Sequence, residues 1–124
     1  MKNLILVIVF FSLTSCYYDS EEALYGTPGS TVCDTTVTNF STVIQPILSS
    51  NCWACHSNSA GPSSGAGVLL QNYTDVKTYV QNGKLIGDIQ QLSGFNQMPK
   101  GGMKLSDCDI LKIQTWIKKG ALNN

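Results

Sequence analysis

The sequence is poor in charge, and it contains no arginine and a single histidine, His56. Of its 124 residues 13% are charged, roughly half of what is usual for a soluble domain, and the formal net charge is zero. A neutral chain generates no field that attracts phosphate backbones, so we expect no nucleic-acid partner. One histidine excludes His-rich zinc sites and leaves few options for acid–base catalysis near neutral pH.

A long hydrophobic run is also missing, but a short one stands at the N-terminus. Lys2 precedes the apolar residues 4–11, and Leu13-Thr14-Ser15-Cys16 follows them. The run is far shorter than the roughly 20 residues that a membrane-spanning helix needs. This order of charged, apolar and small residues predicts an export signal.

The end of this segment resembles the lipobox of bacterial lipoproteins. The resemblance implies that residues 1–15 are removed and that Cys16 becomes a lipid-modified N-terminus, which would anchor the protein durably to a bacterial membrane. The alternative is an ordinary signal peptide followed by a chance cysteine. Acids nearby, Asp19, Glu21 and Glu22, resemble the leaders of some surface-displayed lipoproteins, although such a cluster also keeps a linker solvated. We expect the protein on the periplasmic side of a membrane or at the cell surface.

Residues 16–37 mix acids, Gly, Pro and Ser without apolar periodicity. This composition is typical of a tether between a lipid anchor and a domain, and a short ordered strap on the domain is the alternative. Residues 38–124 are then expected to form one small domain.

Apolar residues recur at helical spacing in this part of the chain, and alternating strand patterns are absent, so we expect an all-α domain. Ser41 is a candidate N-cap for a first helix, and Pro46 predicts that this helix is short or kinked. Thr74 is a candidate N-cap for a helix over 75–81 that stops at Gly83.

The last helix has the clearest signals. Ser106 reads as its N-cap, acids occupy its first turn, and Gly120 suits its end. Its apolar stripe predicts packing of Trp116 against the first helix. The stripe consists of Ile110, Ile113, Trp116 and Ile117, and a further short helix is indicated by Leu85, Ile86 and Ile89.

The most informative motif is Cys52-Trp53-Ala54-Cys55-His56, which follows the first helix. In an exported protein a C-x-x-C-H run is typical of covalent haem attachment. Two thiols on one turn can form thioethers with the two vinyl groups of a porphyrin edge, and the adjacent imidazole can bind the iron. A zinc site would need further Cys or His ligands, a thiol redox motif would need a βαβ context, and chance or structural cysteines are the remaining alternative. We expect one covalent haem c, attached at Cys52 and Cys55, with His56 as the proximal iron ligand.

With this motif the sequence resembles the single-haem class I cytochrome c family over about residues 38–122. The resemblance implies a small helical domain around the haem and a distal Met ligand in a loop before the last helix. Met98-Pro99 resembles the family's Met-Pro pair, and Pro99 stiffens the backbone there, so Met98 is the expected ligand and Met103 the alternative. Core filling is the ordinary use of either methionine.

A thioether is a soft, weak ligand that raises the reduction potential of the iron. Three polar residues, Tyr73, Lys84 and Lys100, could hydrogen-bond haem propionates, although a structural or solvated role is the ordinary one for each.

Five cysteines in so short a chain need an explanation. Lipid attachment at Cys16 and haem attachment at Cys52 and Cys55 leave Cys33 and Cys108. An even pair in an oxidising compartment predicts a disulfide, and two unpaired buried thiols are the alternative.

These expectations describe a one-electron carrier, not an enzyme, whose partners are redox proteins and the membrane. Two other functions stay open. One is a haem with an open or labile sixth position, giving peroxidase-like or gas-binding behaviour. The other is an electron-delivering accessory of a larger enzyme complex.

Overall fold

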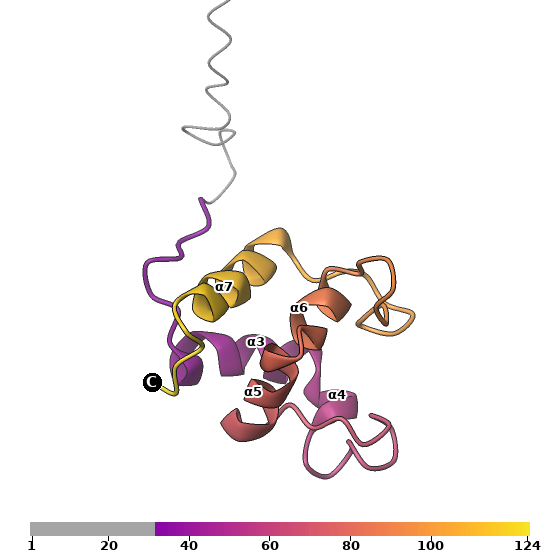
Figure 1. The fold of residues 1–124 in the computed structure, drawn as a ribbon. Coiled ribbons are helices and arrows are strands. Elements are labelled where there is room, and N and C mark those ends of the chain that lie inside the picture. The colour runs from indigo at the N-terminus through magenta and orange to yellow at the C-terminus, as the bar shows by residue number, and fades with distance from the viewer. Residues whose placement is uncertain (1–31) are drawn as a thin grey trace, which may run out of the picture. The chain divides into compact units, whose positions relative to one another are not determined.

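The computed structural model describes residues 32–124, and residues 33–124 form one compact unit. All regular structure in this described part is helical and no strand is present, which confirms the all-α prediction (Figure 1). In chain order the elements are η1 (Phe40–Ile44), α3 (Gln45–Asn51), α4 (Trp53–His56), α5 (Tyr73–Gln81), α6 (Lys84–Ile89) and α7 (Asp107–Lys118).

The first helix is divided into η1, α3 and α4. The element η1 is a π-helical turn, and α3 begins at Gln45 with Pro46 in its first turn. Because Pro46 has no N–H to donate to the carbonyl of Thr42, a regular α-helical ladder cannot run through this point. A second break follows at Cys52, whose backbone leaves helical geometry at φ −124°. The prediction of a short or kinked first helix is confirmed.

The prediction that Ser41 caps this helix is wrong. The chain turns at Asn39, whose carbonyl accepts the N–H groups of Val43 at 3.0 Å and Ile44 at 3.1 Å. The hydroxyl of Ser41 instead donates to the carbonyl of Asn124 at 2.9 Å. Its partner is therefore a distant segment, which local sequence does not indicate.

The α5 helix begins before the predicted N-cap, so the assignment of Thr74 as cap is also wrong. Asn72 is the last extended residue, and Tyr73 already belongs to the helix. Tyr73 lies three positions before the buried Val76, on the same helical face, so extending the helix buries more of this face. Gly83 has a φ of +73°, in the left-handed region, and it ends α5 as predicted.

The α7 helix matches its sequence signals. The hydroxyl of Ser106 accepts the N–H of Asp109 at 3.0 Å and donates to the carboxylate of the same residue at 2.8 Å, which closes a cap of the predicted type. Gly120 follows the helix with a φ of +98°. One face of the helix is buried through Ile110, Ile113 and Trp116.

Trp116 is buried and packs against the first helix, as predicted. Its ring centroid is 5.6 Å from that of Phe40 in η1, and its indole N–H donates to the carbonyl of Leu122 at 2.9 Å. The C-terminal segment is thus fixed against the core by the same side chain. The largest fully buried side chains are Trp116, Ile44, Leu48, Ile113 and Val76.

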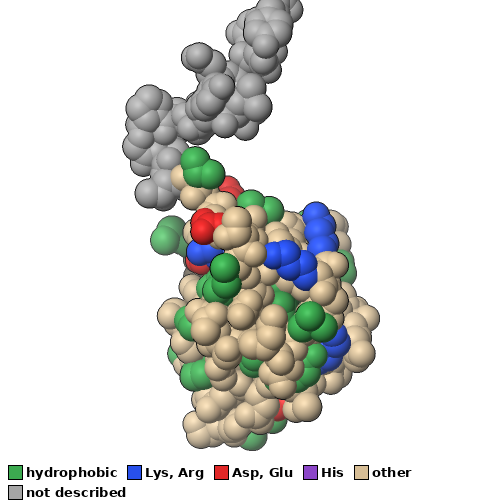
Figure 2. Space-filling view, turned by 90° about the vertical axis from the view of Figure 1, so that its left-hand side faces the viewer, with side chains coloured by type: hydrophobic (Ala, Val, Ile, Leu, Met, Phe, Trp, Pro, Cys, Tyr) green, Lys and Arg blue, Asp and Glu red, His purple; other side chains and the backbone are tan. Residues whose placement is uncertain are grey.

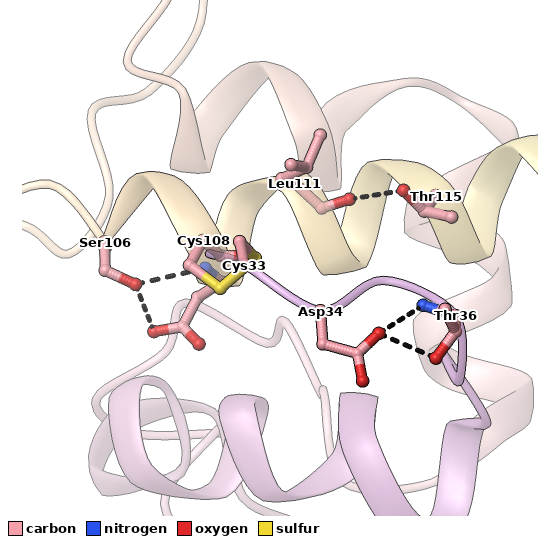
Figure 3. Close-up of a disulfide and its surroundings, with 8 residues drawn as sticks. Cys33, Asp34, Thr36, Ser106, Cys108, Leu111 and Thr115 are labelled. Atoms are coloured by element: carbon pink, nitrogen blue, oxygen red, sulfur yellow. Dashed lines mark hydrogen bonds between the residues drawn. A yellow bond between two sulfur atoms is a disulfide. The ribbon is translucent and has the colours of Figure 1, made fainter. Parts of the chain in front are cut away.

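A disulfide joins Cys33 to Cys108, with an S–S distance of 2.03 Å and Cα atoms 5.4 Å apart. It lies at the start of α7, close to Ser106 (Figure 3). At the other end of this helix, the ammonium group of the C-cap residue Lys119 donates to the carbonyls of Thr35 and Thr36 at 3.3 and 3.0 Å. The predicted disulfide is therefore present in the structure.

These contacts move the predicted domain boundary. Residues 33–37, which the composition assigns to the tether, belong to the compact unit because the disulfide and Lys119 hold them against α7. The rest of the expected tether, the expected signal peptide over 1–15 and the lipidation site Cys16 lie outside the described residues. No helix within residues 32–124 has the length and apolarity needed to cross a membrane.

Candidate functional site

The residues of the C-x-x-C-H motif lie together on a single turn of helix. The N–H of Cys52 donates to the carbonyl of Leu48 at 2.8 Å and so ends α3. The carbonyl of Cys52 then accepts the N–H groups of Cys55 at 3.1 Å and His56 at 2.8 Å. Both thiols and the imidazole therefore start from one compact backbone turn.

The two thiols are free but differ in their surroundings. Cys52 is half-buried and packs against the core, whereas Cys55 is exposed. Burial disfavours the thiolate and raises the pKa of Cys52 to about 11. At neutral pH Cys52 is thus a protonated thiol at the edge of the core, and Cys55 is accessible from solvent.

The side chain of His56 is held by a carbonyl on the far side of a loop. Its Nδ1 lies 3.1 Å from the carbonyl oxygen of Val68. A carbonyl can only accept, so in the neutral imidazole Nδ1 carries the proton and Nε2 keeps its lone pair. Histidines that bind metals commonly have this arrangement, in which the second nitrogen donates to a carbonyl and fixes the orientation of the ring.

Two hydrogen bonds to the backbone of Leu70 bring the nearby Val68 into this position. The carbonyl of His56 accepts the N–H of Leu70 at 2.8 Å, and the indole N–H of Trp53 donates to the carbonyl of Leu70 at 2.9 Å. Trp53, which belongs to the motif, therefore helps to hold the segment around Val68 and Leu70 next to His56.

The loop between His56 and Val68 closes tightly because it is rich in glycine. A Cβ on Gly65 would stand 2.7 Å from Nδ1 of His56 and would also collide with the carbonyl oxygen of Cys55. A Cβ on Gly61 would lie 2.9 Å from the carbonyl oxygen of Val68. The sequence does not indicate the Val68 carbonyl or the role of Gly65, except through the density of glycine in residues 57–67.

The two candidate methionines stand in different environments, on the segment that joins α6 to α7. Met98 is half-buried, and its N–H donates to the carbonyl of Asp88 in α6 at 3.1 Å. The side chain of Met103 is 92% exposed. The fold thus holds Met98 in place and leaves Met103 in solvent, which favours Met98 among the two predicted ligands.

In Figure 1 the α4 turn and the segment that carries Met98 both lie toward the right of the view, and the C-terminus lies toward the left. The left-hand side of the molecule fills Figure 2, where no histidine is visible and the hydrophobic side chains are scattered. Lysine side chains gather in the upper part of that face.

The three polar residues considered for propionate binding have separate positions. The hydroxyl of Tyr73 donates to the carbonyl of Ala121 at 2.8 Å, which gives it a structural role at the C-terminal segment. Lys84 and Lys100 are exposed.

No group of three or more His, Cys, Asp or Glu side chains that could hold a metal ion occurs within the described residues. Models of protein families, curated proteins and solved structures were compared with the chain, and none of them matches it.

Proposed function

We propose that the protein is a single-haem c-type cytochrome that is exported, anchored to a bacterial membrane through Cys16, and carries one electron at a time between redox partner proteins. The observation that supports this most directly is the arrangement of His56. Its Nδ1 donates to the Val68 carbonyl over 3.1 Å, which leaves Nε2 ready to bind a metal one residue after the second of two free thiols.

The residues fit a covalently attached haem c. Cys52 and Cys55 would form the thioethers, Nε2 of His56 would be the proximal iron ligand, and the sulfur of Met98 would be the distal one. The bound haem iron alternates between Fe(II) and Fe(III). The two thiols are free and three positions apart on one turn, as attachment at both requires.

The chain's own groups then have defined tasks. The Val68 carbonyl sets the orientation and tautomer of His56 and makes Nε2 a stronger metal ligand. The half-buried Cys52 connects the attachment turn to the core, and the exposed Cys55 extends it toward solvent. The half-buried Met98 offers a soft ligand that stabilises the reduced state.

The composition favours a carrier over a catalyst. Peroxidase-like chemistry at a haem uses a distal acid–base or cationic group to move protons and stabilise charge. The sequence has no arginine, and its one histidine is assigned to the proximal position. With His and Met as ligands, both axial positions of the iron would be filled, which suits electron transfer.

Export and anchoring have separate support. A disulfide such as Cys33–Cys108 persists in oxidising compartments and is rare in the cytosol. The lipid anchor is supported by the lipobox resemblance at residues 13–16. The compact unit begins at Cys33, so the residues between Cys16 and Cys33 would form the tether.

Haem retention after denaturation tests the proposal. The protein is co-expressed with a cytochrome c maturation system and run on a denaturing gel that is stained for haem, and the band should stay coloured. Cys52→Ala or Cys55→Ala should weaken the stain, and His56→Ala should impair maturation. The double variant Cys33→Ser, Cys108→Ser controls for the loss of cysteines outside the motif. It should still stain for haem although the domain is less stable, because the thioether bonds are covalent. Colour that leaves the unmutated protein on denaturation would contradict the proposal.

The anchor is tested by Cys16→Ser. We expect the unmutated protein to partition into the detergent phase and the variant to remain unprocessed or to be released. Equal partitioning of the two would show that the membrane association does not depend on Cys16.

A further inference from the structure

The segment that carries Met98 is fastened to the end of α6 through Asp88. The backbone carbonyl of Asp88 accepts the N–H of Met98 at 3.1 Å. One oxygen of its side-chain carboxylate accepts the N–H of Asn96 at 2.9 Å. A single residue therefore holds two points of the segment, two positions apart.

A second residue at the end of α6 holds the other side of the Met98 peptide unit. Gln91 has a φ of +56°, in the left-handed region, and its side-chain amide donates to the carbonyl of Met98 at 3.4 Å. The N–H of Met98 is thus bonded to a residue in the last turn of α6, and its carbonyl is bonded to a residue just after that helix.

Within the part of the chain that the structure describes, all hydrogen bonds that connect residues 92–103 to other parts of the fold end on Gly87, Asp88 or Gln91. The ring of Phe95 also lies over Gly87, at the place that a Cβ would occupy. The position of Met98 therefore depends on a few contacts, and the Asp88 carboxylate is the charged one among them.

We propose that Asp88 is a positioning residue for the sulfur of Met98. Its carboxylate holds the Asn96 N–H and thereby keeps the segment folded back on α6, with Met98 half-buried instead of exposed as Met103 is. The inference rests on the proposed function, in which Met98 is the distal ligand.

The expected effect follows from the weakness of a thioether ligand. When a ligand lies on a segment that opens part of the time, its apparent affinity equals its intrinsic affinity multiplied by the fraction of the time that the segment is closed. The bond between the Asn96 N–H and the Asp88 side chain is exposed to solvent, so its loss should raise the open fraction by roughly fivefold.

The test compares Asp88→Ala, which removes the acceptor, with Asp88→Asn, which keeps an oxygen at the same position. Asp75→Ala is the matched control, since among residues 32–124 the Asp75 carboxylate bonds only to Asn72 at the start of α5. Three readouts are taken on the haem-loaded protein: the sulfur-to-iron charge-transfer band, the rate of carbon monoxide binding, and hydrogen exchange of the Asn96 and Met98 amides.

We expect Asp88→Ala to weaken the band, to speed carbon monoxide binding by roughly fivefold, and to speed exchange of both amides. Asp88→Asn and Asp75→Ala should resemble the unmutated protein. A cooperative unfolding transition in chemical denaturation, with a midpoint close to that of the unmutated protein, would show that each variant is folded.

Two results would overturn the inference while leaving the proposed function intact. One is an Asp88→Ala protein with unchanged band, carbon monoxide binding and amide exchange. The other is an Asp88→Asn protein as impaired as Asp88→Ala, because the negative charge and not the acceptor would then matter. If the unmutated protein held no covalent haem, the proposed function would fail, and this inference with it.

Discussion

Nδ1 of His56 lies 3.1 Å from the carbonyl oxygen of Val68, although twelve positions separate the two residues in the sequence. The contact favours one tautomer and one orientation of the imidazole, and it leaves the lone pair of Nε2 available to a metal ion. In the proposed cytochrome it would also make His56 a stronger iron ligand.

Gly65→Ala should disturb this contact while leaving the haem attached. The new Cβ would stand 2.7 Å from Nδ1, so the loop must move and the bond to Val68 should lengthen. A weaker proximal donor stabilises Fe(III) less, so the reduction potential should rise, and overpacking should lower the free energy of unfolding by about 1–3 kcal/mol. Potentiometric titration measures the first effect and chemical denaturation the second. Ser64→Ala, at an exposed position of the same loop, is the control, and a potential unchanged by Gly65→Ala would count against the role assigned to Val68.

Met98→Ala and Met103→Ala form a matched pair. We expect Met98→Ala to abolish the sulfur-to-iron charge-transfer band of the oxidised protein, to lower the potential and to open the iron to carbon monoxide. Met103, whose side chain is 92% exposed, should be replaceable without loss of the band. If Met103→Ala alone erased the band, the ligand assignment would be wrong and the carrier function would survive. An unmutated protein that lacks the band and binds carbon monoxide readily would instead support an open sixth position.

Removal of the disulfide should destabilise the domain strongly. Cys33 and Cys108 are separated by 75 positions, and the chain-entropy relation assigns about 4 kcal/mol to closing a loop of that length. Chemical denaturation of the double variant Cys33→Ser, Cys108→Ser should show this loss in the free energy of unfolding. Equal stability of the variant and the unmutated protein would mean that Lys119 and the neighbouring contacts hold residues 33–37 without the bridge.

The two motif thiols should react at different rates in protein made without haem. Cys55 is exposed and should be alkylated quickly, whereas Cys52 is half-buried and its pKa is raised to about 11. Alkylation of Cys52 should accelerate as the pH rises toward that value, because the thiolate is the nucleophile. The folded state binds this proton more tightly than the unfolded state, so the contribution of Cys52 to stability is present below pH 9 and declines as the pH rises from 9.0 to about 11. Mass spectrometry of timed alkylation gives the rates, and equal rates at neutral pH would contradict the prediction.

Tyr73→Phe should lower the free energy of unfolding by about 1 kcal/mol, since the hydroxyl of Tyr73 donates to the carbonyl of Ala121 at 2.8 Å. Tyr79→Phe, on the same helix, is the control because the Tyr79 hydroxyl forms no hydrogen bond with a described residue. A similar effect of both changes in chemical denaturation would show that the bond to Ala121 is not specifically stabilising.

Local signals in the sequence predicted much of the helical structure. The Ser106 cap, the apolar stripe through Trp116 and Gly120 all act within a few residues, and the α7 helix follows them closely. Pro46 likewise acts on the backbone around it, and the break in the first helix follows. The number of cysteines predicted the disulfide. Three of the five are assigned to the lipid and the haem, and an oxidising compartment favours pairing of the remaining two, Cys33 and Cys108.

Other features depend on segments that meet only in the folded chain. Ser41 has the chemistry of an N-cap, but the C-terminal segment competes for its hydroxyl. Residues 33–37 have the composition of a linker, but the disulfide and Lys119 tie them to α7.

The sequence by itself determined the reactive groups of the candidate site, the two thiols and the imidazole. Cys52, Cys55 and His56 lie within five consecutive residues, so a single turn carries all three. Only the tertiary structure decided how these groups are held. Val68 is joined to His56 by a backbone carbonyl, which every residue possesses, and Met98 is held through Asp88 in the same way. The backbone carbonyl is the same in every residue, so the sequence does not show which carbonyl a side chain will contact. The folded structure is needed to identify it.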